Sequence, residues 1–280
     1  MLIGVLITAA LISTVSESHN LYTNSCDSVK IRGTWYIKVV IWKDVIRPMN
    51  LNVHKSSNTL FFSYSVSDTI VDVDSQIAYI HLNRDEFGAV SGVIGGCAIA
   101  IDQYDDIIYL GGSHGIYTYN MYTKLTDPYK GDNINIWSLF YNRNLFCITF
   151  PKQKLYVEID GNFAPVREFE RCEVDQFFAN NKYMFFANKT GLFSYNVNRS
   201  RAEIIQNVIS VRQITEDNNE NIYVCSNLGT FLLKDGKLIK FINLKSIYGI
   251  AFDNDDNIIY SSDREIVKLV RSEKGCLDNT

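Results

Sequence analysis

Aromatic residues that open a β-rich segment recur along this chain at a nearly constant spacing. The markers are Phe61, Tyr109, Phe146, Phe185, Tyr223 and Tyr260. The last five lie 37, 39, 38 and 37 residues apart, and the first gap is 48. A period of about 40 residues is typical of repeat architectures, in which each unit packs on its neighbours.

Each repeat contains an apolar strand, a polar turn and a second strand. Ala98–Asp102 leads to Ile108–Leu110, and Gly249–Asp253 leads to Ile259–Ser261. Third strands follow glycine turns, at Gly115–Tyr119, Gly191–Tyr195 and Gly229–Leu233. A fourth strand follows at Ala202–Ile205. Four strands per repeat is the propeller pattern, so the sequence predicts an all-β, six-bladed β-propeller.

The last repeat lacks a fourth strand, and the N-terminal region has a β-rich run to spare. We expect Thr34–Trp42 to lie beside Glu265–Val270 and close the ring, which removes an exposed sheet edge. Cys26 and Cys276 then fall at the same end of the two strands, which predicts a disulfide between them. The pairing of the other cysteines is left open: Cys97, Cys147, Cys172 and Cys225.

The N-terminus has the features of a signal peptide. Leu2–Val15 is apolar, and small residues at Ser16 and Ser18 suit cleavage before His19, although Lys and Arg are absent from the start. A short anchor helix is the alternative, but the run is shorter than the ~20 residues that a span needs. We expect residues 1–18 to be removed and 19–280 to form one domain in extracellular, haemolymph-like fluid.

Other features agree with an exported glycoprotein. The six cysteines are an even number, as in disulfide-bonded exported proteins. Sequons begin at Asn188 and Asn198, and Asn198 is the stronger glycosylation candidate. The net charge is −4, and no block of Lys or Arg occurs, which argues against a nucleic-acid partner. We expect a monomer without a membrane or nucleic-acid partner.

Two motifs that suggest chemistry have better structural interpretations. Gly111–Gly115 fits G-x-S-x-G, but no histidine follows His114, so the order required in a hydrolase is not met. Asp253–Asn257 resembles the start of a calcium loop, but Ile258 and Arg264 occupy positions that need Gly and Glu. We expect both to be turns, and no cofactor is predicted.

The chain resembles the insect ommochrome-binding proteins, secreted carriers of phenoxazinone pigments. The matching stretches are Asn58–Tyr64, Gly111–Tyr117, Asn188–Tyr195, Asn221–Cys225 and Tyr248–Asp253. They follow in order along nearly the whole mature chain and are mostly parts of the scaffold. The resemblance implies pigment binding without catalysis and assigns no binding residue.

The mouth of a propeller channel is built by residues that begin the innermost strands and by the turns between second and third strands. Planar anionic pigments favour flat aromatic faces and a cation. The sequence therefore predicts Trp137, Tyr248 and Arg212 as ligand-binding residues where inner strands begin, with Tyr64 and Asp263 in the turns.

Two other functions remain open. A lactonase-type, metal-dependent hydrolase would need channel carboxylates and an Asn around a divalent metal, and only Asp175 and Asp263 are possible ligands. A protein-interaction propeller would use the same face. A non-enzymatic carrier is the favoured hypothesis.

Overall fold

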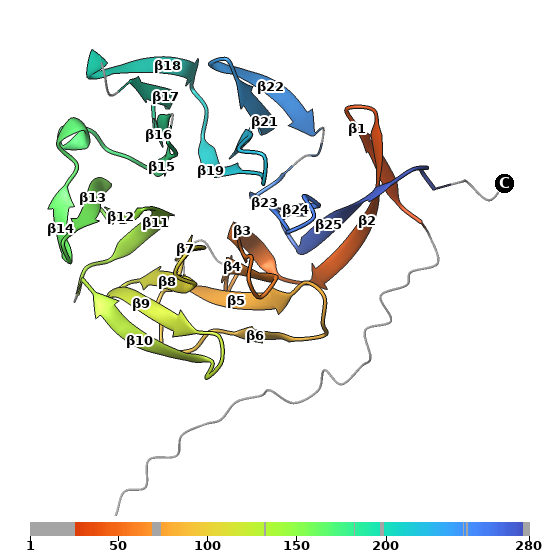
Figure 1. Ribbon diagram of the computed structural model, residues 1–280, viewed down its shortest axis with the longest axis horizontal. Coiled ribbons are helices and arrows are strands. Elements are labelled where there is room, and N and C mark those ends of the chain that lie inside the picture. The colour runs from red at the N-terminus through yellow and green to blue at the C-terminus, as the bar shows by residue number, and fades with distance from the viewer. Residues whose placement is uncertain are drawn as a thin grey trace, which may run out of the picture.

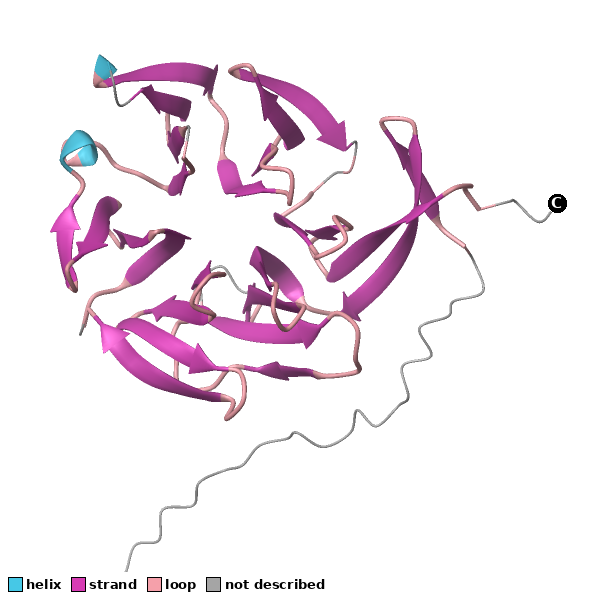
Figure 2. Cartoon of the chain, viewed as in Figure 1, coloured by secondary structure: helices cyan, strands magenta, loops and turns pink. Residues whose placement is uncertain are grey.

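The computed structural model describes residues 26–68, 74–131, 133–181, 183–196, 199–242, 244 and 246–276. Its six antiparallel sheets form a closed ring around a central channel (Figure 1). Strands make up almost all of the regular structure, and η1 (Arg167–Phe169) is a single helical turn (Figure 2). The predicted six-bladed, all-β propeller is confirmed.

Every blade runs from an inner strand at the channel to an outer strand at the rim of the ring. The inner strands are β3 (Ile46–His54), β7 (Ala98–Asp102), β11 (Ile136–Asn142), β15 (Gln176–Ala179), β19 (Val211–Glu216) and β23 (Gly249–Phe252). We name each blade after its inner strand. The end of the channel where these strands begin is the upper end, and the end where they finish is the lower end.

The remaining strands follow the same order in each blade. The second strands are β4 (Thr59–Ser65), β8 (Ile107–Gly112), β12 (Asn144–Thr149), β16 (Met184–Asn188), β20 (Ile222–Ser226) and β24 (Ile258–Ser261). The third strands are β5 (Ser75–His81), β9 (Gly115–Asn120), β13 (Lys154–Ile159), β17 (Gly191–Asn196), β21 (Gly229–Lys234) and β25 (Glu265–Ser272). The fourth strands are β6 (Phe87–Ala89), β10 (Leu125–Lys130), β14 (Asn162–Pro165), β18 (Arg201–Asn207), β22 (Lys237–Ile242) and β2 (Thr34–Lys43).

The two ends of the chain close the ring as predicted. Strand β2 pairs antiparallel with β25, the third strand of the β23 blade (Figure 1). Cys26 and Cys276 form the expected disulfide, with 5.6 Å between their Cα atoms and 250 residues between them in sequence. One strand was not predicted: β1 (Ser28–Ile31) extends this blade to five strands. A two-residue turn makes this hairpin, since Arg32 and Gly33 both have positive φ.

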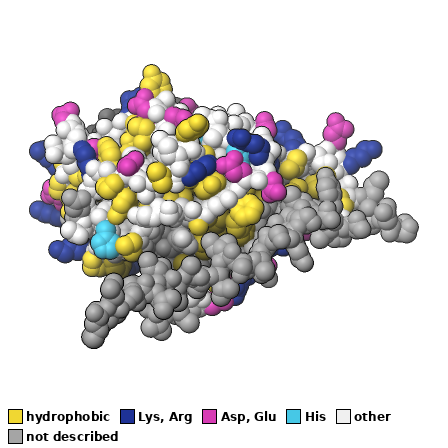
Figure 3. Space-filling model, turned by 90° about the horizontal axis from the view of Figure 1, so that it is seen from below, with side chains coloured by type: hydrophobic (Ala, Val, Ile, Leu, Met, Phe, Trp, Pro, Cys, Tyr) yellow, Lys and Arg dark blue, Asp and Glu magenta, His cyan; other side chains and the backbone are white. Residues whose placement is uncertain are grey.

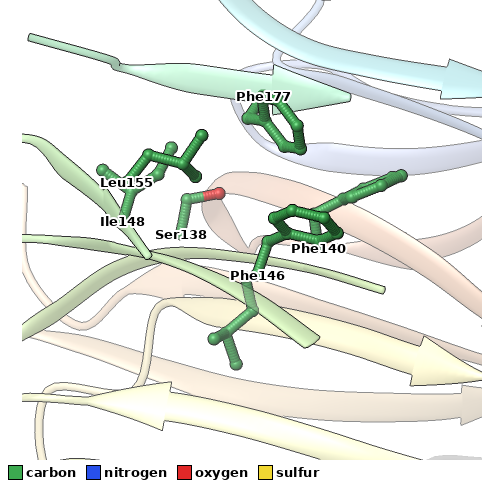
Figure 4. Close-up of a pocket in the computed structure, with 7 residues that line it drawn as sticks. Ser138, Phe140, Phe146, Ile148, Leu155 and Phe177 are labelled. Atoms are coloured by element: carbon green, nitrogen blue, oxygen red, sulfur yellow. The ribbon is translucent and has the colours of Figure 1, made fainter. Parts of the chain in front are cut away.

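The repeated aromatic residues hold neighbouring blades together. Tyr223 packs against Phe252 of the β23 blade with 4.6 Å between ring centroids, and Phe146 lies 5.0 Å from Phe177 of the β15 blade. Figure 4 shows the second contact, where the side chains leave no room for a water-sized molecule. The spacing of the markers therefore reflects interface packing, and this gap is not a binding site.

The loop that resembles a calcium site is a turn held by the chain itself. Asp253 accepts hydrogen bonds at Oδ1 from the backbone N–H groups of Asp255 and Asn257, at 2.9 and 2.8 Å. Its Oδ2 accepts from Lys268 Nζ at 2.7 Å and Asn257 Nδ2 at 3.0 Å. Burial alone raises the pKa of Asp253, but the hydrogen bonds from Lys268 and Asn257 outweigh it, so the pKa is lowered. Both oxygens already have protein donors, as the turn interpretation requires.

Several predictions concern residues that the structure does not describe. The signal peptide, its cleavage before His19 and the sequon at Asn198 lie outside the described residues. Asn188 ends β16, and its Oδ1 accepts from the backbone N–H of Thr190 at 2.9 Å. None of the described helices has the length and apolarity needed to cross a bilayer.

The four other cysteines are thiols in this structure: Cys97, Cys147, Cys172 and Cys225. Burial raises the pKa of Cys97 to about 11 and those of Cys147 and Cys225 to about 12. The thiolate is the reactive form, so these three groups are inert near neutral pH.

Candidate functional site

The structure brings two of the predicted ligand-binding residues together at the upper end of the channel. The guanidinium carbon of Arg212 lies 4.3 Å from the ring centroid of Tyr248. The same guanidinium donates a hydrogen bond to the carbonyl oxygen of Ile247. Arg212 is therefore held in a cation–π contact, with its charge beside an aromatic face.

Trp137 lies at the start of β11, also at the upper end. Its side chain is 41% exposed and stacks on Phe150, with ring centroids 6.0 Å apart and 26° between the planes. Its indole N–H donates to the carbonyl oxygen of Asp175 at 3.0 Å. Trp137 thus presents an aromatic face, while its polar group is already used within the protein.

Tyr64 is less available for a ligand than Asp263. The Tyr64 hydroxyl donates to Gln76 Oε1 at 2.6 Å, and burial raises the pKa of Tyr64. Asp263 is exposed in the turn between β24 and β25, where its backbone carbonyl accepts from the N–H of Arg47 at 2.8 Å. That all five residues bind a ligand at the upper end remains a prediction. Among these five, Arg212 and Tyr248 are in contact.

The lower half of the channel contains a cavity of about 690 Å³. Its wall is formed by the second halves of the inner strands and by the turns that follow them. The polar and aromatic side chains of these turns form what we call the lower rim: Lys55, Tyr104, Arg143, Asn180, Glu216 and Glu220. None of the five predicted ligand-binding residues lines this cavity.

Sequence reasoning missed the lower rim, although a signal was present. Lys55, Arg143, Asn180 and Glu216 each stand at or directly after the end of an inner strand. Aligning the turns of the repeats would have grouped these positions. The aromatic residues Trp137 and Tyr248 led instead to a predicted site at the upper end of the channel.

Amide side chains form hydrogen bonds between the inner strands of different blades and give the cavity a polar wall. Gln213 donates to the carbonyl oxygen of Leu51 at 2.7 Å and accepts from the N–H of Ile250 at 3.2 Å, so it joins three blades. Asn142 of β11 donates to the carbonyl oxygen of Ala179 of β15 at 2.7 Å, across the interface between these two blades. These bonds satisfy strand edges that would otherwise need water. The cavity is thus lined by groups whose positions are set before a ligand arrives.

Both signs of charge are present on the lower rim. Partial burial raises the pKa of Glu216, and the neighbouring Glu220 adds to this effect, whereas a hydrogen bond from Asn180 and the charge of Lys55 oppose it. Within the described ranges, no three His, Cys, Asp or Glu side chains are grouped so that they could hold a metal ion. The arrangement is suited to non-covalent binding of a ligand with polar and apolar parts.

A buried histidine links two turns beside this rim. His54 is 1% exposed; its Nδ1 lies 2.7 Å from Ser57 Oγ and its Nε2 lies 2.9 Å from Asp106 Oδ1. Burial lowers the pKa of His54, and the charge of Asp106 opposes this. Asp106 belongs to the turn of the β7 blade, so His54 joins this blade to the β3 blade.

We expect the fold to lose stability as the pH falls below about 6.5. Burial lowers the pKa values of both His54 and His81, so the unfolded chain takes up protons in this range before the folded chain does. Stability from these groups is present above pH 6.5 and is lost on acidification. Asp175 and Glu216 have raised pKa values and act in the opposite direction, but nearer their ordinary values of 3.8 and 4.5.

Urea denaturation at about pH 7.5 and pH 5.5 measures this effect. The midpoint should fall on acidification, and a variant that carries both His54→Gln and His81→Gln should show a smaller fall. A midpoint that rises or stays level over this range would contradict the assignment of neutral, buried imidazoles.

The outer surface carries mixed charge. On the side of the ring drawn in Figure 3, Lys and Arg side chains are interspersed with Asp and Glu rather than separated by sign. This view shows no single-sign field of the kind that steers large polyanions.

Comparisons with solved structures place the fold among propellers. A gluconolactonase from Xanthomonas campestris superposes with a TM-score of 0.65 at 9% identity, over 85% of this chain and 90% of that chain. An auxiliary nutrient-binding protein from Bacteroides thetaiotaomicron superposes with a TM-score of 0.59 at 13% identity, over 82% of this chain and 70% of that chain. The extracellular domain of a putative hybrid two-component system from B. thetaiotaomicron superposes with a TM-score of 0.55 at 14% identity. The match covers 86% of this chain and 40% of that chain. At these identities the likeness concerns the fold alone.

The amino-acid sequence is similar to that of a known protein along nearly its whole length. No family model matches the chain. The ommochrome-binding protein of Manduca sexta is 34% identical over 260 residues, which cover 89% of this chain and 92% of the relative. Identity at this level over nearly the whole of both proteins shows common descent, and the chain belongs to the ommochrome-binding protein family.

Proposed function

We propose that this protein carries an ommochrome-type pigment, or a similar planar aromatic molecule, in its central channel without converting it. The observation that supports this most is the cavity of about 690 Å³ at the lower end. Small-molecule sites have volumes of roughly 300–1,000 Å³ and combine apolar walls with a few polar groups. The pigment-binding name of the Manduca sexta relative supports the choice of ligand.

The lining of the cavity supports an aromatic ligand. Phe140 contributes to its wall, and Tyr104 stands at its rim and is 94% exposed, whereas the rings of Phe178 and Phe252 are buried between blades. Burial of a flat ring removes apolar surface at about 25 cal/mol per Å², and part of this gain is lost to the ordering of the ligand. Lys55 and Arg143 would pair with an anionic group.

The upper end remains the alternative place for the pigment. There Arg212, Trp137 and Tyr248 would supply the cation and the aromatic faces, with Tyr64 and Asp263 beside them. The lower end presents a cavity of ligand size. We therefore propose the lower end as the main site and treat the upper-end residues as its matched controls.

Pigment titration tests the function and the site together. Absorbance change and tryptophan quenching should show saturable binding of xanthommatin-type pigment at micromolar concentration. Changing Lys55 and Arg143 to Gln should weaken binding by about 1–3 kcal/mol, because each would lose a charge-assisted hydrogen bond. The matched control, Arg212→Gln, should leave the affinity unchanged.

The outcomes separate the alternatives. Absence of saturable change in the wild-type protein would refute pigment carriage. Loss of affinity in Arg212→Gln, with none in the double variant of Lys55 and Arg143, would move the site to the upper end. Recovery of altered pigment after incubation would show turnover and would favour the hydrolase alternative.

Export is part of the same proposal. We propose a mature, monomeric chain that begins near His19 and carries glycan at Asn198, with Asn188 as the second candidate. The Cys26–Cys276 disulfide supports this, because such bonds persist in oxidising compartments. Mass spectrometry of protein from its natural source should show a start near His19. An intact segment from Met1 to Ser18 would contradict export by this route.

A further inference from the structure

Two tyrosines at the lower end of the β7 blade are almost fully exposed and are held in the same kind of turn. Tyr104 is 94% exposed in the turn between β7 and β8, and Tyr122 is 95% exposed in the turn between β9 and β10. The backbone N–H of Tyr104 donates to Asp102 Oδ1 at 2.9 Å, and that of Tyr122 donates to Asn120 Oδ1 at 2.9 Å. Both phenols therefore project from the packed blade, where an enzyme in solution can reach them.

Acidic side chains lie next to Tyr104. Asp105 and Asp106 follow it directly in the turn, and both residues are exposed. Asp106 Oδ1 lies 2.9 Å from His54 Nε2, but 57% of the Asp106 side chain remains exposed. Asp102, two residues before Tyr104, is buried beneath the turn. The phenol of Tyr104 is therefore presented together with exposed negative charge.

Tyr122 is followed by a neutral residue and a basic one. Thr123 and Lys124 come next in the sequence, and Lys124 Nζ lies 2.8 Å from Glu86 Oε1. The glutamate that reaches this turn is thus paired with a cation. The two turns share their exposure and their backbone hydrogen bonding, and they differ in the charge that accompanies the phenol.

This difference matters for one modification of exported proteins, the sulfation of tyrosine. The reaction takes its sulfuryl group from a nucleotide phosphosulfate, which is a polyanion. A transferase that binds such a donor presents cationic groups near the acceptor phenol. Complementary charge guides an acidic segment to this surface and disfavours a basic one. The turn of Tyr104 meets this requirement, and the turn of Tyr122 does not.

We propose that Tyr104 is a tyrosine-sulfation site. The sulfur–oxygen bond between the sulfuryl group and the phosphate of the donor breaks, and the sulfur forms a new bond to Tyr104 Oη. The phosphate keeps the electron pair, and the phenol proton passes to a base of the transferase, so nothing is oxidised or reduced. This inference goes beyond pigment binding and rests on the proposed export, because donor and transferase act in the secretory pathway.

The modification would change the charge of the lower rim. Tyr104 lines the mouth of the lower cavity. An aryl sulfate stays ionised across the physiological pH range, so the ester adds a permanent negative charge at this mouth. Such a charge acts on its surroundings by the same electrostatic rules as a phosphate group.

Mass spectrometry of the full chain secreted from cultured insect cells tests the site. Trypsin cuts after Arg84 and Lys124, so one peptide of residues 85–124 contains both Tyr104 and Tyr122. This peptide should be heavier by one SO3 group. The shift should survive phosphatase and should disappear when chlorate blocks synthesis of the phosphosulfate donor. An unmodified peptide, or a shift that phosphatase removes, would overturn the inference.

Variants identify the residue that carries the group. Tyr104→Phe should lose the mass shift completely, whereas the matched control Tyr122→Phe should keep it. The double variant Asp105→Asn, Asp106→Asn retains the phenol and should lower the sulfated fraction. A shift that persists in Tyr104→Phe would refute the site. An unchanged sulfated fraction in the double variant would contradict the role assigned to the acidic residues.

The N-terminus of the same sample separates this result from that for export. A chain that starts near His19 and carries no sulfate on Tyr104 would refute this inference and leave export standing. An intact segment from Met1 to Ser18, with no sulfate, would refute both.

Discussion

Reduction of the Cys26–Cys276 disulfide is expected to lower the free energy of unfolding by about 3–5 kcal/mol. The bond joins positions 250 residues apart, so it restricts the unfolded chain over almost its whole length. It also lies beside the pairing of β2 with β25, the contact that closes the ring. Chemical denaturation of oxidised and reduced protein at neutral pH measures the difference.

The double variant Cys26→Ser, Cys276→Ser is the control. Its stability should match that of the reduced wild type, and reductant should not change it further, because the other four cysteines are free thiols. A reductant effect that persists in this variant would show that another disulfide exists. Equal midpoints for oxidised and reduced wild type would contradict a stabilising role of the closure bond.

Asp253→Ala is expected to destabilise the fold by about 3–5 kcal/mol. The Asp253 side chain is 1% exposed and lies 2.7 Å from Lys268 Nζ, whose side chain is 14% exposed. Removing the carboxylate leaves a largely buried ammonium group without its partner, and two turn N–H groups lose their acceptor. Thermal or urea denaturation reports the loss.

A matched turn in the β19 blade provides the control. Asp217 accepts at Oδ1 from the N–H groups of Asn219 and Asn221, as Asp253 does from its own turn, but its Oδ2 meets the neutral hydroxyl of Tyr223 in place of a lysine. Asp217→Ala should therefore cost less than Asp253→Ala. Adding Lys268→Met to Asp253→Ala should restore part of the stability. Equal losses in the two single variants would show that the ion pair contributes nothing beyond the turn.

The repeat made the architecture predictable from the sequence. Residues such as Tyr223 recur because each blade needs a large ring at the interface with its neighbour, here against Phe252 at 4.6 Å. The missing fourth strand of the last blade identified β2, and the positions of Cys26 and Cys276 then identified the disulfide. These conclusions depend on local pattern and connectivity, both of which are visible in a sequence.

The location of the cavity could not be predicted in the same way. Trp137 and Tyr248 have the chemistry that a planar ligand needs, but residue type does not show how much space remains around a side chain. The open volume depends on how six inner strands fill the channel together, and it remains near Lys55 and Arg143. Strand β1 was missed for a related reason, since four residues beyond a complete blade carry little pattern of their own.

A crystal structure of the protein with bound pigment tests the central claim most directly. The account predicts one chromophore in the lower half of the channel, with its ring in the cavity and its anionic group within hydrogen-bonding distance of Lys55 or Arg143. Pigment density between Arg212 and Trp137 at the upper end, with the lower cavity filled only by water, would contradict it.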